Sequence, residues 1–199
     1  MKIVVIGATG TIGKPVADAL ASRHEVVRAS RHGPARADLE DPASIEELLD
    51  DVKDVDAVVN CAGSAAFRPL AQLSEADFHL GIKSKLMGQV NLARIAMARV
   101  RDGGSITLTG GILAHEPMPG GAAISMVNAG LEGFVIGASL EMPRGLRLNV
   151  INPPWISETL VALKMDPSRG IPAVACAKAY VAAVEGGYQG QALDARKFA

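Results

Sequence analysis

Residues 3–13 read Ile-Val-Val-Ile-Gly-Ala-Thr-Gly-Thr-Ile-Gly, a short apolar run followed at once by a glycine-rich stretch. The β-branched run predicts a buried strand, and Val16, Ala17 and Leu20 predict a helix directly after the glycines. Glycines at such a turn let the backbone approach a pyrophosphate, which the free N–H groups and positive dipole end of the helix attract. This context predicts a dinucleotide site formed by the turn residues Gly7, Thr9, Gly10, Thr11, Ile12 and Gly13.

The rest of the chain continues the alternation of strand and helix. Near-continuous apolar runs, typical of parallel strands covered on both faces, occupy residues 3–6, 25–29, 55–60, 105–109 and 146–151. Helical crossovers between these runs complete an α/β architecture, a doubly wound parallel sheet of the Rossmann type with helices on both faces. Because no linker or repeat interrupts the pattern, residues 1–199 are expected to form a single NAD(P)-binding domain.

Sequence signals also mark individual helices. Asp41 is expected to cap a helix over residues 42–52, whose apolar side chains form one stripe. A helix is expected to start near Ser74, where Ser-Glu-Ala-Asp is a capping box, and a long helix is expected from about Gly81 to Val100. A helix over residues 121–142 is apolar nearly all round, which indicates that it is covered on several sides.

The sheet can bury only one side of the apolar helix at 121–142, so another surface must bury the rest. We expect a homodimer or homotetramer in which the helices at 81–100 and 121–142 pack against their symmetry mates. The alternative is burial within one chain by the last helix, expected over residues 173–185.

The composition argues against several classes of protein. With 49% hydrophobic and 21% charged residues, the chain should fold, and a formal net charge of −1 supplies no basic field for nucleic acid or anionic lipid. No run of eighteen or more apolar residues predicts a membrane helix, and the apolar start is too short for a signal peptide. Cys61 and Cys176 suggest no disulfide framework, and His24, His32 and His79 lack metal-ligand spacing. A cytoplasmic protein with a small-molecule substrate and no metal, membrane or nucleic-acid partner is therefore expected.

The end of the second strand bears on the choice of dinucleotide. An acidic residue here would accept the ribose 2′-hydroxyl of NAD, but the chain reads Arg28-Ala29-Ser30-Arg31. Guanidinium donors match phosphate oxygens, which a carboxylate would repel. Ser30 and Arg31 therefore predict NADP as the cofactor, with ordinary solvated loop charge as the alternative for both arginines.

Further motifs, in chain order, resemble those of the short-chain dehydrogenase/reductase family. They are Asp38-Leu39, Asn60-Cys61-Ala62-Gly63, Gly104-Ser105-Ile106, Asn128 to Phe134, Arg147 to Pro154 and a closing strand at 190–194. The resemblance implies a strand order of 3-2-1-4-5-6-7, with a stunted third strand near Ala35 to Asp38. It also implies cofactor contacts at Asp38, Leu39, Cys61, Ala62, Gly63, Pro153, Pro154, Trp155, Ile156 and Thr159.

The family's catalytic quartet is not found at the expected positions. The family uses Tyr as proton donor, Lys four residues later to lower the Tyr pKa and hold the ribose, Ser to position the carbonyl, and Asn to anchor a water relay. Aligned in that order, the positions hold Ile124, Asn128, Gly111 and Lys85. The only tyrosines, Tyr180 and Tyr188, lie near the C-terminus, which disfavours either as a displaced donor.

Since the family's tyrosine is missing, another residue is expected to donate the proton. His115, with Glu116 beside it, is expected in the loop after the strand at 105–109, at the sheet edge where open α/β folds bind ligands. Lys85, with Ser84 beside it, and Ser125 are the other candidate catalytic residues. For each, an ordinary solvated or capped side chain is the alternative.

These residues predict an NADP-dependent oxidoreductase of the short-chain dehydrogenase/reductase type. It would transfer hydride to a small carbonyl-like substrate and use a non-standard proton donor. One alternative is a catalytically silent NADP-binding sensor or partner protein. The other is a non-redox isomerase or dehydratase in which His115 and Glu116 perform acid/base chemistry.

Overall fold

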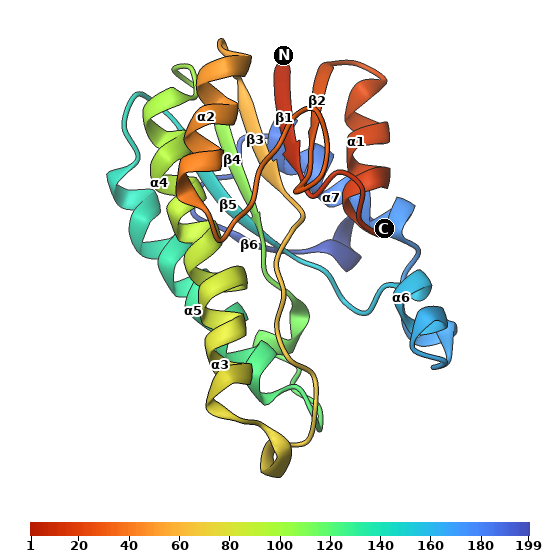
Figure 1. Cartoon of the computed structure of the whole chain (residues 1–199). Helices are drawn as coiled ribbons and strands as arrows, with labels where there is room; N and C mark the ends of the chain where they lie inside the picture. The colour runs from red at the N-terminus through yellow and green to blue at the C-terminus, as the bar shows by residue number, and fades with distance from the viewer.

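A six-stranded sheet crosses the molecule in the order β2-β1-β3-β4-β5-β6, with every neighbouring pair parallel. The computed structural model describes all 199 residues, and Figure 1 shows helices on both sides of the sheet. The strands are β1 (Lys2–Ile6), β2 (Glu25–Ala29), β3 (Ala57–Asn60), β4 (Ser105–Thr109), β5 (Arg147–Asn152) and β6 (Ala192–Asp194). The predicted doubly wound α/β fold is confirmed.

The third strand expected near Ala35 to Asp38 is wrong. Residues 30–37 contribute one isolated parallel bridge, from Ser30 to Arg36, and no ladder. Pro34 has no N–H to donate, and residues 31–34 are all exposed, so a strand cannot propagate from this bridge. As a result β2 forms one edge of the sheet.

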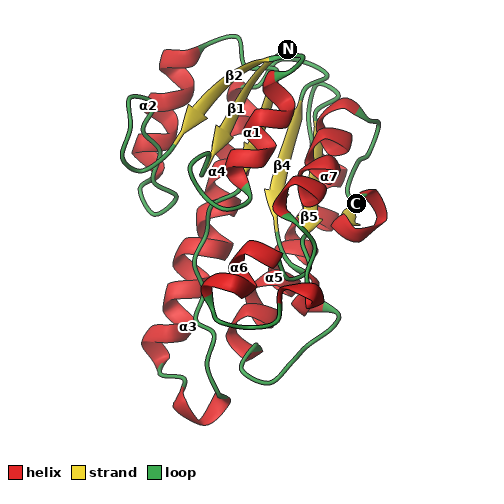
Figure 2. Ribbon diagram, turned by 90° about the vertical axis from the view of Figure 1, so that its right-hand side faces the viewer, coloured by secondary structure: helices red, strands yellow, loops and turns green.

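Helices cover the two faces of the sheet in separate layers (Figures 1 and 2). One layer contains α2 (Pro42–Val52), α4 (Gly88–Arg99) and α5 (Ala122–Ala138), and the other contains α1 (Gly13–Ala21) and α7 (Ala173–Glu185). A shorter helix, α6 (Ser157–Ala162), lies beyond the end of β5.

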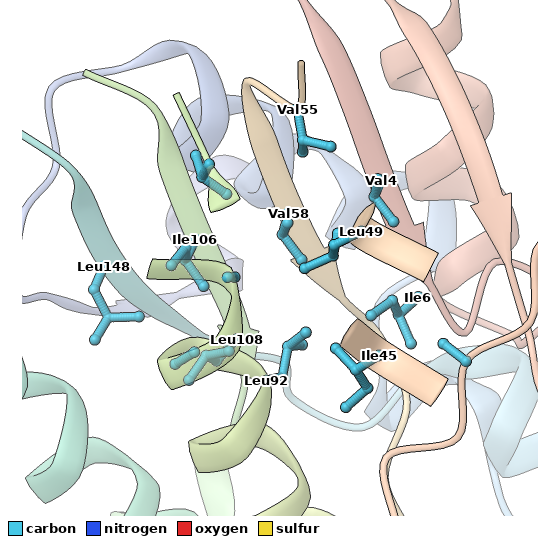
Figure 3. Close-up of a cluster of buried hydrophobic side chains, with 14 of the residues drawn as sticks. Val4, Ile6, Ile45, Leu49, Val55, Val58, Leu92, Ile106, Leu108 and Leu148 are labelled. Carbon is cyan, nitrogen blue, oxygen red and sulfur yellow. The ribbon is translucent and has the colours of Figure 1, made fainter. Parts of the chain in front are cut away.

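Alternate residues of each central strand belong to opposite layers. In β1, Val4 and Ile6 join the cluster with α2, whereas Ile3 and Val5 join the cluster with α1 and α7. Figure 3 shows the first cluster, where Val4, Ile6 and other strand side chains meet Ile45 of α2. Since both faces are covered by apolar side chains, the strands read as unbroken apolar runs.

The predicted helix at 42–52 is confirmed, but its predicted cap is wrong. The Asp41 side chain makes no capping hydrogen bond. Instead, the Ser44 hydroxyl accepts the N–H of Asp38 at 2.9 Å and donates to the Asp41 carbonyl at 2.8 Å. The start of α2 is thereby joined to the loop that follows β2.

The helix expected to start near Ser74 is confirmed, and with the long helix expected over 81–100 it forms one continuous helical segment. It consists of α3 (Glu75–Gly81), a π-helical segment η2 (Ile82–Met87) and α4. The predicted capping box is present, because the Ser74 hydroxyl accepts the Asp77 N–H at 3.3 Å and Asp77 accepts the Ser74 N–H at 2.9 Å. The π-helical segment was not anticipated.

The apolar helix α5 is partly covered by the sheet. With its final turn it spans Ala122–Glu141 at a hydropathy of 1.4, which by length and composition alone suits a membrane span, contrary to the expectation above. In the fold it is a core helix, with Val127, Leu131 and Val135 buried. Cover by the last helix is wrong, because α7 packs on the opposite side of the sheet. Ile136 and Leu140 stay exposed, at 56% and 87%.

Candidate active site

The glycine turn joins β1 to α1 at the carboxyl edge of the sheet. A Cβ on Gly13 would lie 2.0 Å from the carbonyl oxygen of Gly7, so only glycine lets the turn close this tightly. The N–H groups of Thr11, Ile12 and Gly13 donate to no oxygen in the chain. Successive free amides at a helix N-terminus form a cradle for an anion. The predicted turn therefore has the donors and the shape that a pyrophosphate requires.

A cavity of about 240 Å³ extends from this turn over the ends of β1, β2 and β3. Ser30 and Arg31, predicted to contact a 2′-phosphate, lie on its wall. Arg28 does not, because its guanidinium donates to the Asp18 carboxylate at 2.8 Å. Arg31 is thus the arginine that remains available to a ligand.

Two carboxylates share the wall of this cavity with Arg31. The Asp38 Oδ1 accepts the Glu40 N–H at 3.0 Å, and the Glu40 carboxylate pairs with the Lys83 ammonium at 3.0 Å. Leu39 is buried between them and packs on Gly88 of α4. The loop that holds Asp38 and Leu39 is therefore fixed from both α2 and α4.

A second cavity of about 240 Å³ adjoins the first and shares Cys61, Ala62 and Gly63 with it. Most of its wall is apolar, from Ile12, Ile112, Leu113, Ile124, Pro153, Pro154 and Trp155. Its polar lining comes from Lys85, Thr109, Gly110, Gly111 and Asn128. The four positions aligned with the family's quartet thus meet in one cavity, with different side chains.

Lys85 is the only charged side chain on that wall. Its ammonium has no hydrogen-bond or ion-pair partner in the chain, and burial lowers its pKa to about 8. The side-chain stem lies against Gly63, where a Cβ would be 3.3 Å from both the Cα and Cγ of Lys85. Gly63 has a φ of +140°, so both its conformation and its neighbour favour glycine.

The backbone of Lys85 is anchored by Gln89, a fully buried side chain of α4. The Gln89 Nε2 donates to the carbonyls of Lys85 at 2.8 Å and of Thr109 at 2.9 Å. Its Oε1 accepts from the Thr109 N–H at 2.8 Å and from the Asn60 Nδ2 at 2.9 Å. Since Lys85 lies inside the π-helical segment, these bonds hold an irregular turn against the ends of β3 and β4.

Asn128 faces the same cavity from α5. Its Nδ2 donates to the Gly111 carbonyl at 3.2 Å, but its buried Oδ1 has no partner. A buried acceptor without a donor costs free energy. Of the two unpaired groups, the Asn128 Oδ1 is inaccessible, so the Lys85 ammonium is the unpaired polar group that the second cavity offers.

The family follows from comparison with known proteins. A family model described as Enoyl-(Acyl carrier protein) reductase matches residues 4–183, most of the chain. The chain is a short-chain dehydrogenase/reductase. Its fold is similar to the crystal structure of the protein lin1944 from Listeria innocua, with a TM-score of 0.92, 36% identity and 98% of each chain covered.

Two other similarities are to proteins described as dehydrogenases. A small-chain dehydrogenase crystallised in complex with NADPH shares the fold, with a TM-score of 0.84 and 24% identity over 98% of this chain and 95% of that one. The 2,3-dihydro-2,3-dihydroxybenzoate dehydrogenase of Escherichia coli is 31% identical over 111 residues, 54% of this chain and 45% of that protein. The chain spans about half the length of the first curated relatives it matches.

The other candidate catalytic residues of this dehydrogenase/reductase lie off both cavity walls. The His115 Nε2 is 2.7 Å from the Glu132 carboxylate, and Glu116 pairs with Arg196 at 2.7 Å. The Ser125 hydroxyl is buried without a partner. Of the three candidates, Lys85 alone lines the second cavity, while neighbouring Ser84 lines the first.

Neither tyrosine lines the second cavity. Tyr180 is fully buried among α1 and α7 side chains, where burial raises its pKa well above the usual value. Its hydroxyl lies 2.8 Å from that of Thr109, which itself donates to the Asn60 carbonyl. Tyr180 must therefore donate to Thr109, and its proton is already engaged. Tyr188 stacks edge-on against Phe198.

Most predicted cofactor residues line one of the two cavities, and four do not. Thr11 and Gly13 belong to the turn itself, Ile156 is buried in the core, and Thr159 lies on α6. For the histidines, His24 pairs with Glu185 and His79 with Glu75. The chain contains no group of three or more His, Cys, Asp or Glu residues placed to hold a metal ion.

The sequence analysis missed two buried polar groups near the site. One is Gln89, whose four bonds no spacing pattern reveals. The other is Glu132, which accepts from the Asn152 Nδ2 at 2.5 Å, while the Asn152 Oδ1 accepts the Gly111 N–H at 2.9 Å. Together with His115, these residues fix the loop after β4 that forms one wall of the second cavity.

Proposed function

We propose that this short-chain dehydrogenase/reductase is an NADP-dependent oxidoreductase that reduces a small carbonyl-like substrate. The observation that carries the proposal is the pair of adjoining cavities along the carboxyl edge of the sheet. The polar cavity at the glycine turn suits adenosine and phosphates, and the mostly apolar one suits a nicotinamide and a substrate. The bound nicotinamide would supply the hydride.

The preference for NADP rests on the end of β2. Ser30 and Arg31 lie on the wall of the polar cavity, and no carboxylate occupies the last positions of this strand. A free guanidinium there favours a 2′-phosphate over a hydroxyl. Asp38 would instead contact the adenine, as the family resemblance implies. The NADPH complex of a protein of the same fold supports the same choice.

The walls of the second cavity favour a compact, largely apolar substrate. At its mouth the Trp155 indole packs edge-on against Phe67, with ring centroids 5.5 Å apart, and its Nε1 lies 3.2 Å from the Met118 sulfur. With Ile124 at the position of the family's tyrosine, the proton must come from another group.

Absorbance of the reduced cofactor tests this function. The protein is mixed with NADPH and a panel of ketones, enones and imines, and oxidation is followed for each compound. Turnover with any class supports the oxidoreductase, whereas tight NADPH binding without turnover would favour the silent sensor. Calorimetry showing no heat with any pyridine nucleotide would rule out both.

We also propose that the protein is a cytoplasmic homodimer or homotetramer joined through η2, α4 and α5. Met87 of η2, Met126 and Ile136 of α5, and Leu140 in the turn after α5 leave apolar surface exposed. Sedimentation at micromolar concentration should show a dimer or tetramer. Replacing Leu140 by Asp should shift it toward monomer, and a wild-type protein that sediments only as monomer would contradict the proposal.

A further inference from the structure

In the second cavity, the amine of a lysine and the amide of an asparagine occupy opposite positions to those implied by the family resemblance. The family resemblance places Asn at position 85 and Lys at position 128, whereas this chain has Lys85 and Asn128. Both side chains line the same cavity, Lys85 from η2 and Asn128 from α5. The cavity has therefore kept its amine but receives it from the opposite wall.

The chain holds this amine in place without neutralising it. Gly63 lies flat against the lysine stem, and Gln89 binds the lysine carbonyl at 2.8 Å. No carboxylate lines the cavity. By contrast, Lys83, two residues earlier, is exposed and pairs with Glu40 at 3.0 Å. A charged group that is positioned, half-buried and unpaired at a ligand cavity is a candidate for chemistry, because structural lysines normally gain a partner.

We propose that Lys85 is the proton donor of the reaction, and that the substrate is an uncharged ketone or aldehyde with apolar substituents. This inference rests on the proposed function. An anionic substrate would pair with the ammonium and hold its proton back, whereas an uncharged carbonyl oxygen accepts it as negative charge develops.

The reaction balances with a reduced nicotinamide dinucleotide as the reductant. The carbonyl carbon accepts a hydride, with its electron pair, from the reduced nicotinamide, and the C=O π bond breaks toward oxygen. The oxygen takes one proton from the Lys85 ammonium. The carbonyl is reduced to an alcohol, the nicotinamide is oxidised, and the neutral Lys85 amine regains a proton from water.

The surroundings of Lys85 contain no group that would obscure its titration. On the cavity wall the other titratable side chain is Cys61, whose pKa burial raises far above neutrality. The segments packed on η2 carry the charged residues Glu75, Asp77, His79, Arg94, Arg99 and Glu132. Of these, Glu75 pairs with His79, Asp77 with Arg68, Arg99 with Asp50, and Glu132 with His115.

The pH dependence follows from a pKa of about 8 for Lys85. Below this pH the amine is protonated and can donate, so carbonyl reduction should be constant. Above it the rate should fall about tenfold per pH unit, as the protonated fraction falls. Alcohol oxidation needs the neutral amine, so its rate should rise with pH and level off above about pH 8.

One test measures the amine itself and needs no substrate. Lysines are dimethylated with ¹³C-formaldehyde and borane, and the methyl signals are titrated by NMR. The signal that is missing in Lys85→Met is expected to have a midpoint near 8. A Lys85 midpoint at the ordinary lysine value of about 10.4 would overturn the proposal.

A second test measures catalysis with phenylpropanedione, an uncharged diketone, and with benzoylformate, its carboxylated analogue. Lys85→Met should lower kcat for the diketone by about 10² to 10⁴-fold, with NADPH affinity kept. Lys83→Met, at an exposed lysine on the same segment, should leave kcat unchanged. In Lys85→Ala, added methylammonium should restore part of the rate.

The outcomes separate the two proposals. If wild-type protein binds no pyridine nucleotide, the proposed function fails whatever the amine titration shows. If wild-type protein reduces the diketone and Lys85→Met does so equally fast, with the same pH profile, only the role of Lys85 fails. A Lys85→Met variant with a raised KM for benzoylformate alone, and an unchanged kcat, would make Lys85 an anion-binding residue and overturn the proposal.

Discussion

The two ends of the ligand-binding edge are built in different ways. At the glycine turn, the groups that would meet a ligand are backbone amides of Thr11, Ile12 and Gly13. In the second cavity they are side chains, Lys85 and Asn128, set among apolar residues. A site made of backbone amides requires a particular chain geometry, so its glycine pattern can be recognised in the sequence. In a site made of side chains, the residue types can change while the shape of the cavity is kept.

The largest effect is expected at the glycine turn, from the addition of a single methyl group. In Gly13→Ala the new Cβ would start 2.0 Å from the Gly7 carbonyl oxygen, so the turn must open. We expect a loss of about 3 kcal/mol in the free energy of unfolding, from denaturant melts. We also expect at least about a tenfold weaker Kd for NADPH, by calorimetry.

A matched glycine provides the control for this substitution. Gly133 lies in α5 with nothing within 4 Å of its added Cβ. Gly133→Ala should therefore keep NADPH affinity and stabilise the helix by about 0.5–1 kcal/mol. Equal behaviour of the two variants would show that the turn is not the tight cradle described above.

In the second cavity, we expect the largest effect from replacing Gln89, which anchors the backbone of Lys85. Gln89→Met removes four hydrogen bonds and leaves the buried Asn60 amide and the Thr109 backbone without their partner. We expect a loss of about 2 kcal/mol in the free energy of unfolding. The exposed Gln72→Met should change stability by less than about 0.5 kcal/mol.

The Gln89 variant also sharpens the comparison of the two ends. Since Gln89 holds the Lys85 backbone, carbonyl reduction should fall more than NADPH affinity does. A variant that loses cofactor binding and turnover in equal proportion would show that the two ends are one unit.

The smallest expected effect distinguishes the two arginines near β2. Arg31→Ala should weaken NADPH binding about fivefold and leave NADH binding unchanged, since it removes one exposed donor to a phosphate. Arg28→Ala should change neither, because Arg28 is already bound by Asp18 at 2.8 Å. Tighter binding of NADH than NADPH by the wild-type protein would remove the basis for this contrast.

The sequence was sufficient for the architecture because the signals there are local and repeated. Apolar runs, the glycine turn and the capping box at Ser74 each depend on residues close in the chain. The prediction of a short third strand near Ala35 to Asp38 was wrong because it rested on the family resemblance. In this chain, Pro34 lies in an exposed loop just before that segment. The Asp41 cap failed because Ser44, three residues later, takes over the local hydrogen bonds.

The site could be predicted only in part for the opposite reason. Alignment brought positions 85, 111, 124 and 128 to one cavity, which the structure also shows. It could not tell that His115 turns toward Glu132, or that Gln89 supports Lys85, since these contacts join residues distant in sequence. The π-helical segment likewise leaves no periodic signal in six residues.

The absence of a third strand exposes one flank of β2, whose only neighbour is β1. An open flank of this kind can recruit a strand from another molecule and seed aggregation. Glu25 and Arg28 are exposed along β2, and Arg28 is held by Asp18. Charged side chains on an edge strand disfavour such pairing. Arg28, which does not line the cavity at the glycine turn, therefore helps to protect the open edge of β2 from strands of neighbouring molecules.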